Sequence, residues 1–257
     1  MSKPFSIADI RLYPREVCLE AKKVLNKYNK TCMTIVNAKK VGSMNWLIDA
    51  CKPKSPEDFY NAWVHDDTYK KSDDPEERGR TIDELYHLSL EYQAKCDMEI
   101  PVLTYFQDIL MHTIYQTWDG RIKEEEVKRK FEERGYTVEH SHFKEDSRLN
   151  IDFLVYKEGK LQFLVQVKPI STFMNNAPWA PKTRKYFFKK QAMGMKKYGV
   201  PYYYLIYNTH YDTDTKWVYN DKRGSFFFTL EELCSEDGML KKGVDLSTYS
   251  ERSEISS

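Results

Sequence analysis

The segment Leu161–Lys168 constrains the fold more than any other part of this sequence. It reads Leu-Gln-Phe-Leu-Val-Gln-Val-Lys, a nearly continuous apolar run that ends at Pro169. Runs of this length and composition are typical of central strands that are covered on both faces of a sheet. Because side chains alternate along a strand, Gln166 and Lys168 are expected to share one face.

Other segments extend this strand into a mixed sheet. We expect strands at 136–143, 150–156 and 202–207, with 226–228 as the candidate fifth strand; 158–159 is a hairpin turn. Amphipathic helices are expected at 121–134 and 182–198, the second one crossing between the third and fourth strands. The fold class is therefore α/β, with a central mixed sheet of 4–5 strands flanked by helices.

The first half of the chain has helical periodicity instead. The interpretation divides the chain into a helical region for recognition or dimerisation (1–98), a catalytic core (99–244) and a flexible, Ser-rich tail (245–257). A strongly apolar helix is expected at 100–118, interrupted by Asp119-Gly120 before the next helix begins.

Composition excludes several classes of protein. With 40 Lys+Arg against 39 Asp+Glu the chain is no polyelectrolyte, and its five cysteines form no Cys-x-x-Cys pair. Because no signal peptide or long apolar span is visible, we expect a cytoplasmic protein with reduced thiols and no membrane partner. There is no phosphate-binding glycine loop and no nucleophile elbow, and His140 and His142 have no further zinc ligands at suitable spacing.

The residues that carry chemistry are Asp152, Gln166 and Lys168. Burying an ammonium group without a partner is expensive, so Lys168 should emerge at the strand end or meet an anion. Asp152 lies on the neighbouring strand, across the hairpin, and can be that partner. Carboxylate and amide oxygens beside a cation could also bind a hard divalent metal such as Mg²⁺. The simpler alternative is a strand-end ion pair beside a surface glutamine.

Asp152, followed after thirteen residues by Gln166-Val167-Lys168, resembles the metal-dependent nuclease superfamily with the PD-(D/E)xK signature. Two positions depart from that signature: Ile151 replaces its proline and Gln166 replaces its second acid. The second departure removes one negative charge from the metal site. The resemblance implies Mg²⁺ ligands from Asp152, Gln166 and the Val167 carbonyl, with Lys168 acting beside them.

In this superfamily a helix acid often completes the site. Glu124 is the candidate, because it precedes Val127 and Phe131 by three and seven residues and should share their inward stripe. The alternative is a solvated Glu run at a helix start. Asp108 is the weaker candidate.

The pattern across residues 24–210 is similar to the MjaI-like family of type II restriction endonucleases. Val24-Leu25-Asn26-Lys27 and the segment 41–48 resemble the opening motif of that family. The resemblance implies sequence-specific double-strand cleavage that leaves 5′-phosphate and 3′-hydroxyl ends, within a restriction-modification system that has a cognate DNA methyltransferase. Because cutting a palindrome needs two symmetric active sites, a homodimer is expected.

Charge distribution also favours DNA as the partner. No acidic residue lies between Glu158 and Asp212, whereas nine Lys and Arg residues do. Asn can pair with adenine and Arg with guanine, so base recognition is also possible here. The residues expected to contact DNA are Asn175, Asn176, Lys182, Arg184, Lys185, Lys189 and Lys190.

Three other functions remain open. A DNA repair or junction nuclease would use the same chemistry but would recognise structure rather than sequence. A noncatalytic DNA-binding protein could use the nuclease scaffold, because Gln166 replaces an acid. An ordinary ligand-binding α/β domain, with an incidental basic face, is the third.

Overall fold

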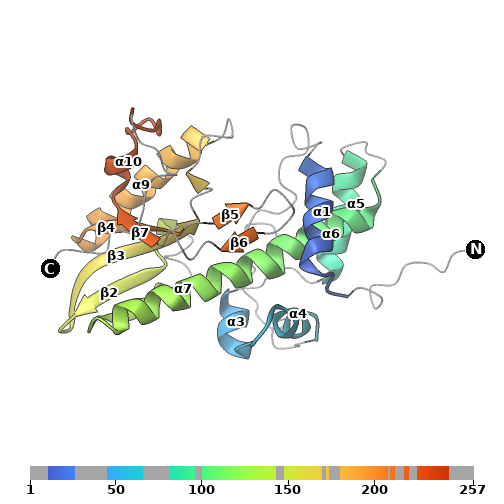
Figure 1. The fold of residues 1–257 in the computed structure, drawn as a ribbon, viewed down its shortest axis with the longest axis horizontal. Helices are drawn as coiled ribbons and strands as arrows, with labels where there is room; N and C mark the ends of the chain where they lie inside the picture. Colours follow the sequence, from blue (N-terminus) through green and yellow to red (C-terminus); the bar gives the residue numbers. More distant parts are fainter. Residues whose placement is uncertain are drawn as a thin grey trace, which may run out of the picture. The chain divides into compact units, whose positions relative to one another are not determined.

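The structure is a computed structural model of the whole chain (Figure 1). It describes residues 11–26, 45–65, 82–95, 100–142, 148–169, 172–173, 180–207, 209–211, 217–219 and 225–242. The predicted tail at 245–257 therefore lies outside the described residues. Among the described helices, none is both long and apolar enough to cross a membrane.

Within the described residues, helices make up the first half of the chain, and the strands lie after residue 136. The helices of the first half are α1 (Arg15–Asn26), α3 (Asn45–Cys51), α4 (Pro56–His65), α5 (Ile82–Lys95), α6 (Val102–Leu110), the π-helix η3 (Met111–Gln116) and α7 (Thr117–Glu132). The second half contains β1 (Thr137–His140), β2 (Phe153–Lys157), β3 (Lys160–Pro169), α9 (Ala180–Tyr198), β4 (Tyr202–Tyr207), β5 (Thr209–Tyr211), β6 (Trp217–Tyr219), β7 (Ser225–Phe228) and α10 (Leu230–Leu233).

The chain forms two compact units, Met1–Arg121 and Ile122–Ser257, called here the helical unit and the sheet unit. The boundary between them falls inside α7. The division expected at residues 98 and 99 stays a prediction.

Helix α7 runs through Asp119 and Gly120, so the predicted interruption there is wrong. A glycine inside a helix costs only about 1 kcal/mol relative to alanine, which neighbouring contacts can offset. One such contact is the pair of hydrogen bonds, 3.0 and 2.7 Å long, that Arg15 donates to the Asp119 carboxylate.

The helical unit has its own apolar core. Helix α1 packs against α6, and fully buried aromatic side chains fill the interior. These side chains are Phe59, Trp63, Tyr105 and Phe106.

The sheet unit contains a mixed sheet with the strand order β1-β2-β3-β4-β7. Strands β1, β2 and β3 are antiparallel to one another, β3 and β4 are parallel, and β7 is antiparallel to β4. Helix α9 makes the connection between the parallel strands, as expected for a crossover. The predicted α/β class, with a mixed sheet and a helical first half, is confirmed. Strands β5 and β6 pair separately as a two-stranded sheet.

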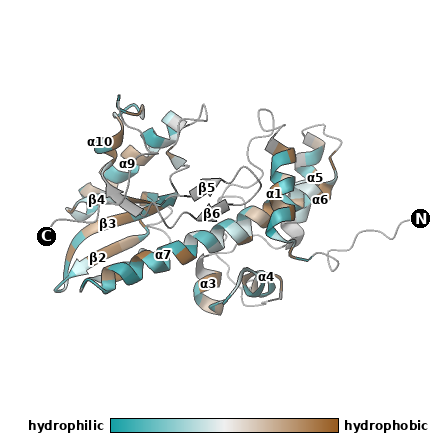
Figure 2. Cartoon of the chain, in the orientation of Figure 1, coloured by the Kyte–Doolittle hydropathy of each residue, from teal (hydrophilic) through white to brown (hydrophobic). Residues whose placement is uncertain are grey.

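Helices cover both faces of this sheet. Val127 and Phe131 of α7 pack on one face with Phe163, Val165 and Val167 of β3. On the other face, Leu164 packs with residues of α9, β4 and α10. Figure 1 shows α7 on one side of the strands and α9 with α10 on the other, and Figure 2 colours most of β2 and β3 as hydrophobic. Burial on both faces explains the continuous apolar run of β3.

Candidate functional site

Asp152 and Gln166 meet where β2 begins and β3 ends. The Gln166 Nε2 donates a hydrogen bond of 2.6 Å to Asp152 Oδ2, and the Val167 N–H donates one of 2.7 Å to the same oxygen. The backbone of Asp152 is also held on both sides, because its N–H donates to the Val165 carbonyl and its carbonyl accepts from the Ser141 N–H. The predicted juxtaposition of Asp152 with Gln166 and Val167 is thus present in the structure.

This cluster lies in the protein interior. Asp152 is 8% exposed and Gln166 is 1% exposed, whereas Lys168 is half-buried at the strand end. Burial raises the pKa of the Asp152 carboxyl above its ordinary value. The charge of Lys168 and the hydrogen bonds from Val167 and Gln166 act in the opposite direction. Lys168 is therefore close enough to Asp152 to influence its ionisation.

The Gln166 side chain has one polar atom without a partner. Its Oε1 is buried and accepts no hydrogen bond within the described residues. A buried acceptor without a donor costs about 1–3 kcal/mol unless a ligand or a water satisfies it. An oxygen that lacks a donor, next to a buried carboxylate, is chemically suited to a hard cation.

A metal ion at this place would depend on few protein ligands. No group of three His, Cys, Asp or Glu side chains that could hold a metal occurs within the described part of the chain. The residues present fit Mg²⁺ only if the Asp152 carboxylate, Gln166 Oε1 and the Val167 carbonyl act together with water. These donors are all oxygens, which is the ligand type that Mg²⁺ prefers.

Glu124 does not lie on the buried stripe of α7 that the sequence predicted. The buried residues of this helix are Lys123, Val127 and Phe131, spaced four apart, and Glu124 is half-buried beside them. The helix packs on the sheet face of Val165 and Val167, whereas Gln166, by alternation, belongs to the opposite face. Residues three or four positions apart both lie on the same side of a helix, so the sequence allowed either Glu124 or Lys123 on the buried stripe. In the structure, packing places Lys123 there.

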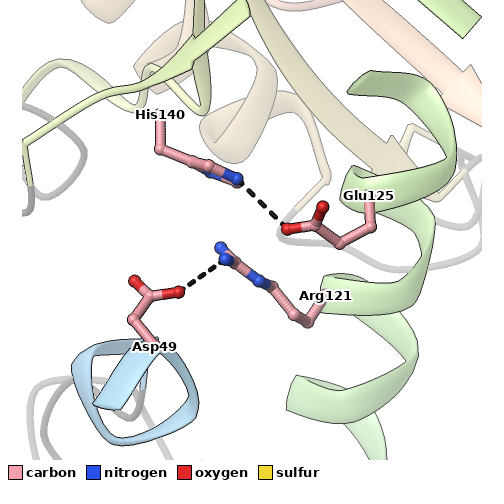
Figure 3. A network of polar contacts seen from close by, with 4 residues as sticks. All are labelled: Asp49, Arg121, Glu125 and His140. Atoms are coloured by element: carbon pink, nitrogen blue, oxygen red, sulfur yellow. Dashed lines mark hydrogen bonds and ion pairs between the residues drawn. The ribbon is translucent and has the colours of Figure 1, made fainter. Parts of the chain in front are cut away.

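Two polar contacts of α7 were missed by the sequence interpretation. Glu125 Oε1 lies 3.3 Å from His140 Nε2, at the end of β1, and Figure 3 shows the two side chains facing each other. Arg121 of the same helix donates to Asp49 of α3 at 2.5 Å, also drawn in Figure 3. His140 pairs in register with Phe153, the residue after Asp152. The sequence signal available was only a His at a strand end preceded by a Glu-rich helix.

Lys123 was also missed. Its ammonium is 2.8 Å from Glu126 Oε2 and 5.7 Å from the centre of the Tyr207 ring, at the end of β4. Burial alone would raise the pKa of Glu126, but hydrogen bonds from Lys123 and Lys130 hold it below its ordinary value. This buried lysine is therefore neutralised locally and has a structural partner.

The weaker acid candidate, Asp108, belongs to the helical unit, whereas Asp152 belongs to the sheet unit. Asp108 lies on α6, with its Oδ1 3.5 Å from His112 Nε2. Burial raises the pKa of the Asp108 carboxyl, while His112 and Lys22 lower it. Its neighbours in the structure are thus helix residues of its own unit.

The predicted DNA-contacting lysines all lie on α9. Lys182, Lys185 and Lys189 are exposed on α9, and Lys190 is half-buried, donates to the Arg148 carbonyl and lies 5.0 Å from the Tyr186 ring. Asn175 and Asn176 lie outside the described residues.

The buried position of Arg184 contradicts its predicted contact with DNA. Its side chain is 0% exposed, and it donates hydrogen bonds to the carbonyls of Gly238 and Phe173 at 2.5 and 2.8 Å. A guanidinium used in this way is not presented to DNA. The prediction that Arg184 reads a base is therefore corrected to a structural role.

Comparison of the chain with protein-family models, with curated proteins and with solved structures gave no match.

Proposed function

We propose that the protein is a Mg²⁺-dependent type II restriction endonuclease with a PD-(D/E)xK-like site, cutting both strands of a short DNA sequence. The observation that carries the proposal is the buried cluster of Asp152, Gln166 and Val167, with Lys168 next in the strand. The order helix, three strands, helix, strand around this cluster supports the same function. Helix α7 precedes the strands, and α9 crosses between β3 and β4.

Each residue of the site has a role in this proposal. Asp152, Gln166 and the Val167 carbonyl would hold Mg²⁺, which would supply positive charge to the scissile phosphate. Val167 N–H fixes the Asp152 carboxylate by a hydrogen bond and so orients it. Lys168 orients the attacking water and stabilises the negative charge that develops on the phosphate oxygens. The products carry 5′-phosphate and 3′-hydroxyl ends, and no covalent intermediate forms.

Glu124, the predicted helix acid, remains part of the proposal, but not as a direct member of the buried cluster. Glu124 lies on α7, whose buried stripe faces the opposite side of the sheet from Gln166. Any contribution from Glu124 to the metal is therefore through solvent molecules rather than through the buried cluster. A cognate methyltransferase, cytoplasmic location and cleavage by a homodimer belong to the same proposal.

One observation favours a second candidate, a noncatalytic DNA-binding protein on the same scaffold. Gln166 Nε2 donates to the Asp152 carboxylate, so an amide occupies an oxygen that a metal could use. A metal would have to share this oxygen with the amide or displace it.

Plasmid cleavage tests the proposal. The wild type, Asp152→Ala and Lys168→Ala are incubated with a sequenced plasmid, with and without Mg²⁺. Lys160→Ala is the matched control, because Lys160 is an exposed lysine at the opposite end of the same strand. We expect discrete, Mg²⁺-dependent fragments from the wild type and Lys160→Ala, and their loss in the other two variants. Each loss is expected to exceed about a hundredfold in rate.

Other outcomes identify the alternatives. Smeared products that depend on Asp152 and Lys168 would indicate a nuclease without sequence specificity. Cleavage of branched but not of linear DNA would indicate a junction nuclease. A folded wild type that binds DNA without cutting it would leave the noncatalytic scaffold as the function.

A further inference from the structure

Helix α9 carries a second feature that the catalytic cluster does not use. Its sequence contains no acidic residue, and its six lysines all lie within an arc of about 140° around the helix axis. Five are exposed and Lys190 is half-buried. We call this set the lysine stripe: Lys182, Lys185, Lys189, Lys190, Lys196 and Lys197.

The opposite side of α9 is fixed against the sheet. Phe187 is buried against Tyr204, with ring centres 5.6 Å apart, and the Gln191 amide donates to the Tyr202 carbonyl. Gly194 lies so close to Tyr202 that an added Cβ would be 2.9 Å from its ring. The apolar side of the helix is therefore already covered, and the lysine stripe lies on the solvent side.

The direction of the stripe relates it to the candidate site. Phe187, in the first half of α9, packs on Tyr204, which pairs in register with Gln166. The helix then runs away from that end of the sheet, towards the beginning of β4. From Lys182 to Lys196 the helix rises by about 21 Å, which corresponds to about six base-pair steps of duplex DNA.

Two acidic residues of the described part of the chain lie near α9: Glu231 Oε2, which accepts a hydrogen bond of 3.3 Å from the buried Gln191 amide, and Asp237. Asp237, in the turn after α10, is close enough to Lys185 to be influenced by its charge. Its carboxylate also accepts hydrogen bonds from Ser235 Oγ and the Met239 N–H. Lys189 and Lys196 lie further along the helix, beyond this turn.

We propose that the lysine stripe binds the phosphate backbone of duplex DNA next to the cut, extending about six base pairs to one side of it. Its place beside the cut rests on the proposed nuclease function, whereas its affinity for duplex DNA does not. Lysines without a matching set of base-reading side chains contribute affinity and position rather than sequence recognition.

Two other polyanions fit the stripe less well. An amphipathic helix binds a membrane by inserting its apolar side, and that side of α9 is buried in the sheet unit. Single-stranded nucleic acid is held largely by stacking on several aromatic rings. Among the described α9 residues, only Tyr186 presents a largely exposed ring, at 45%. Duplex DNA needs only a row of positive charges along its phosphate backbone.

The test measures DNA binding without cleavage. A fluorescent duplex of random sequence, about two helical turns long, is titrated with protein in EDTA at several salt concentrations. The stripe variant is Lys189→Gln/Lys196→Gln, and the matched control is Lys157→Gln/Lys160→Gln, which removes two exposed lysines from the β2–β3 hairpin. Thermal unfolding is compared first, to show that both variants are folded.

We expect the log K of the stripe variant to fall less steeply with log salt than that of the wild type. The magnitude of the slope should decrease by about 1.8, because each lost phosphate contact contributes about 0.9. At about 0.1 M salt this corresponds to binding about sixtyfold weaker than that of the wild type. The control should bind like the wild type. Equal slopes for the wild type and the stripe variant would overturn the proposal, as would an equal loss in both variants.

Two further probes decide the kind of polyanion. A single strand of the same length, or phosphatidylcholine vesicles containing phosphatidylserine, should bind more weakly than the duplex. Tighter binding of either one would overturn the assignment to duplex DNA.

Cleavage then separates this proposal from the catalytic one. If Mg²⁺-dependent cleavage is found, wild-type cutting should slow when one flank is shorter than about six base pairs, and the stripe variant should lose this dependence. Cleavage with no flank dependence overturns the stripe's position and leaves the nuclease intact. A less steep salt dependence of the stripe variant, combined with no cleavage by the wild type, supports the stripe as a DNA-binding surface and rejects the nuclease function.

Discussion

Gln166 is the residue at which the candidate site departs from a two-acid metal site. Its amide nitrogen donates to Asp152, while its oxygen is buried without a partner. A glutamate here would remove the donor and add a second negative charge beside a carboxylate that burial already makes harder to ionise. Gln166 therefore stabilises the metal-free protein and weakens the electrostatic attraction for a cation.

Gln166→Glu tests this exchange. Without metal we expect a lower unfolding temperature than for the wild type, because the 2.6 Å contact with Asp152 would join two carboxylates. With millimolar Mg²⁺ the variant should gain more thermal stability than the wild type, since two carboxylates attract the ion more strongly. Differential scanning calorimetry in EDTA and in Mg²⁺ measures both effects. An equal Mg²⁺ response in the two proteins would exclude Gln166 as a metal-facing residue.

Asp152→Asn tests the effect of burial on the carboxyl group. Because the folded protein raises the pKa of Asp152, folding favours the protonated form. The stabilising contribution of this group is therefore complete at low pH and is lost as the pH rises through the folded-state pKa. Asparagine is neutral at every pH, and its oxygen can still accept from the Val167 N–H.

We therefore expect the stability of the wild type, measured relative to Asp152→Asn, to fall as the pH rises above about 4. Thermal unfolding in EDTA over a range of pH, followed by circular dichroism, measures this difference. A difference that does not vary with pH would mean that the Asp152 pKa is unchanged by folding.

At the scale of elements, a contact between the first turns of α9 and the turn after α10 fixes the helix. Arg184 donates hydrogen bonds to the carbonyls of Gly238 and Phe173. The turn itself is closed by an isolated antiparallel β-bridge between the backbones of Cys234 and Leu240. Gly238 has a φ of 84° and lies against the backbone of Pro181 and Lys185. Arg184 and Gly238 together determine how α9 presents the lysine stripe.

Gly238→Ala is expected to destabilise the protein by about 2–4 kcal/mol, because it combines a left-handed backbone with a steric clash. The added Cβ would lie 2.9 Å from the Lys185 amide nitrogen and closer still to the Pro181 carbonyl oxygen. Gly120→Ala is the matched control: Gly120 is inside α7, and its added Cβ would meet nothing within 4 Å. This change should stabilise the protein by about 0.5–1 kcal/mol. Urea unfolding of both variants measures the two effects, and destabilisation by both would contradict the assignment.

At the scale of the molecule, the chain is built from a helical unit and a sheet unit with separate apolar cores. Every catalytic residue named under the proposal lies in the sheet unit. The proposal therefore gives the helical unit, with its buried aromatic core around Trp63, a role in recognition or self-association rather than in the chemistry.

Association in solution is the prediction at this scale. Symmetric cutting of a palindrome requires two copies of the site, so we expect a homodimer with twice the chain mass of 30.6 kDa. Sedimentation velocity over a range of protein concentrations, with and without DNA, measures the mass. A protein that stays monomeric on DNA while cutting both strands would contradict the two-fold arrangement and would favour sequential nicking.

The sequence by itself determined the class of fold and the central strand. Apolar periodicity depends on local chain geometry, so the run at 161–168 specified a strand covered on both faces, and its spacing from Asp152 placed two polar groups at neighbouring strand ends. Tertiary structure decided what depends on contacts between distant residues. It put Lys123 rather than Glu124 on the buried stripe of α7, carried that helix through Gly120, and buried Arg184 beneath a turn more than fifty residues away. A helix or a charge can be recognised from its neighbours in the chain, but the side that is buried depends on packing against residues that the local pattern does not contain.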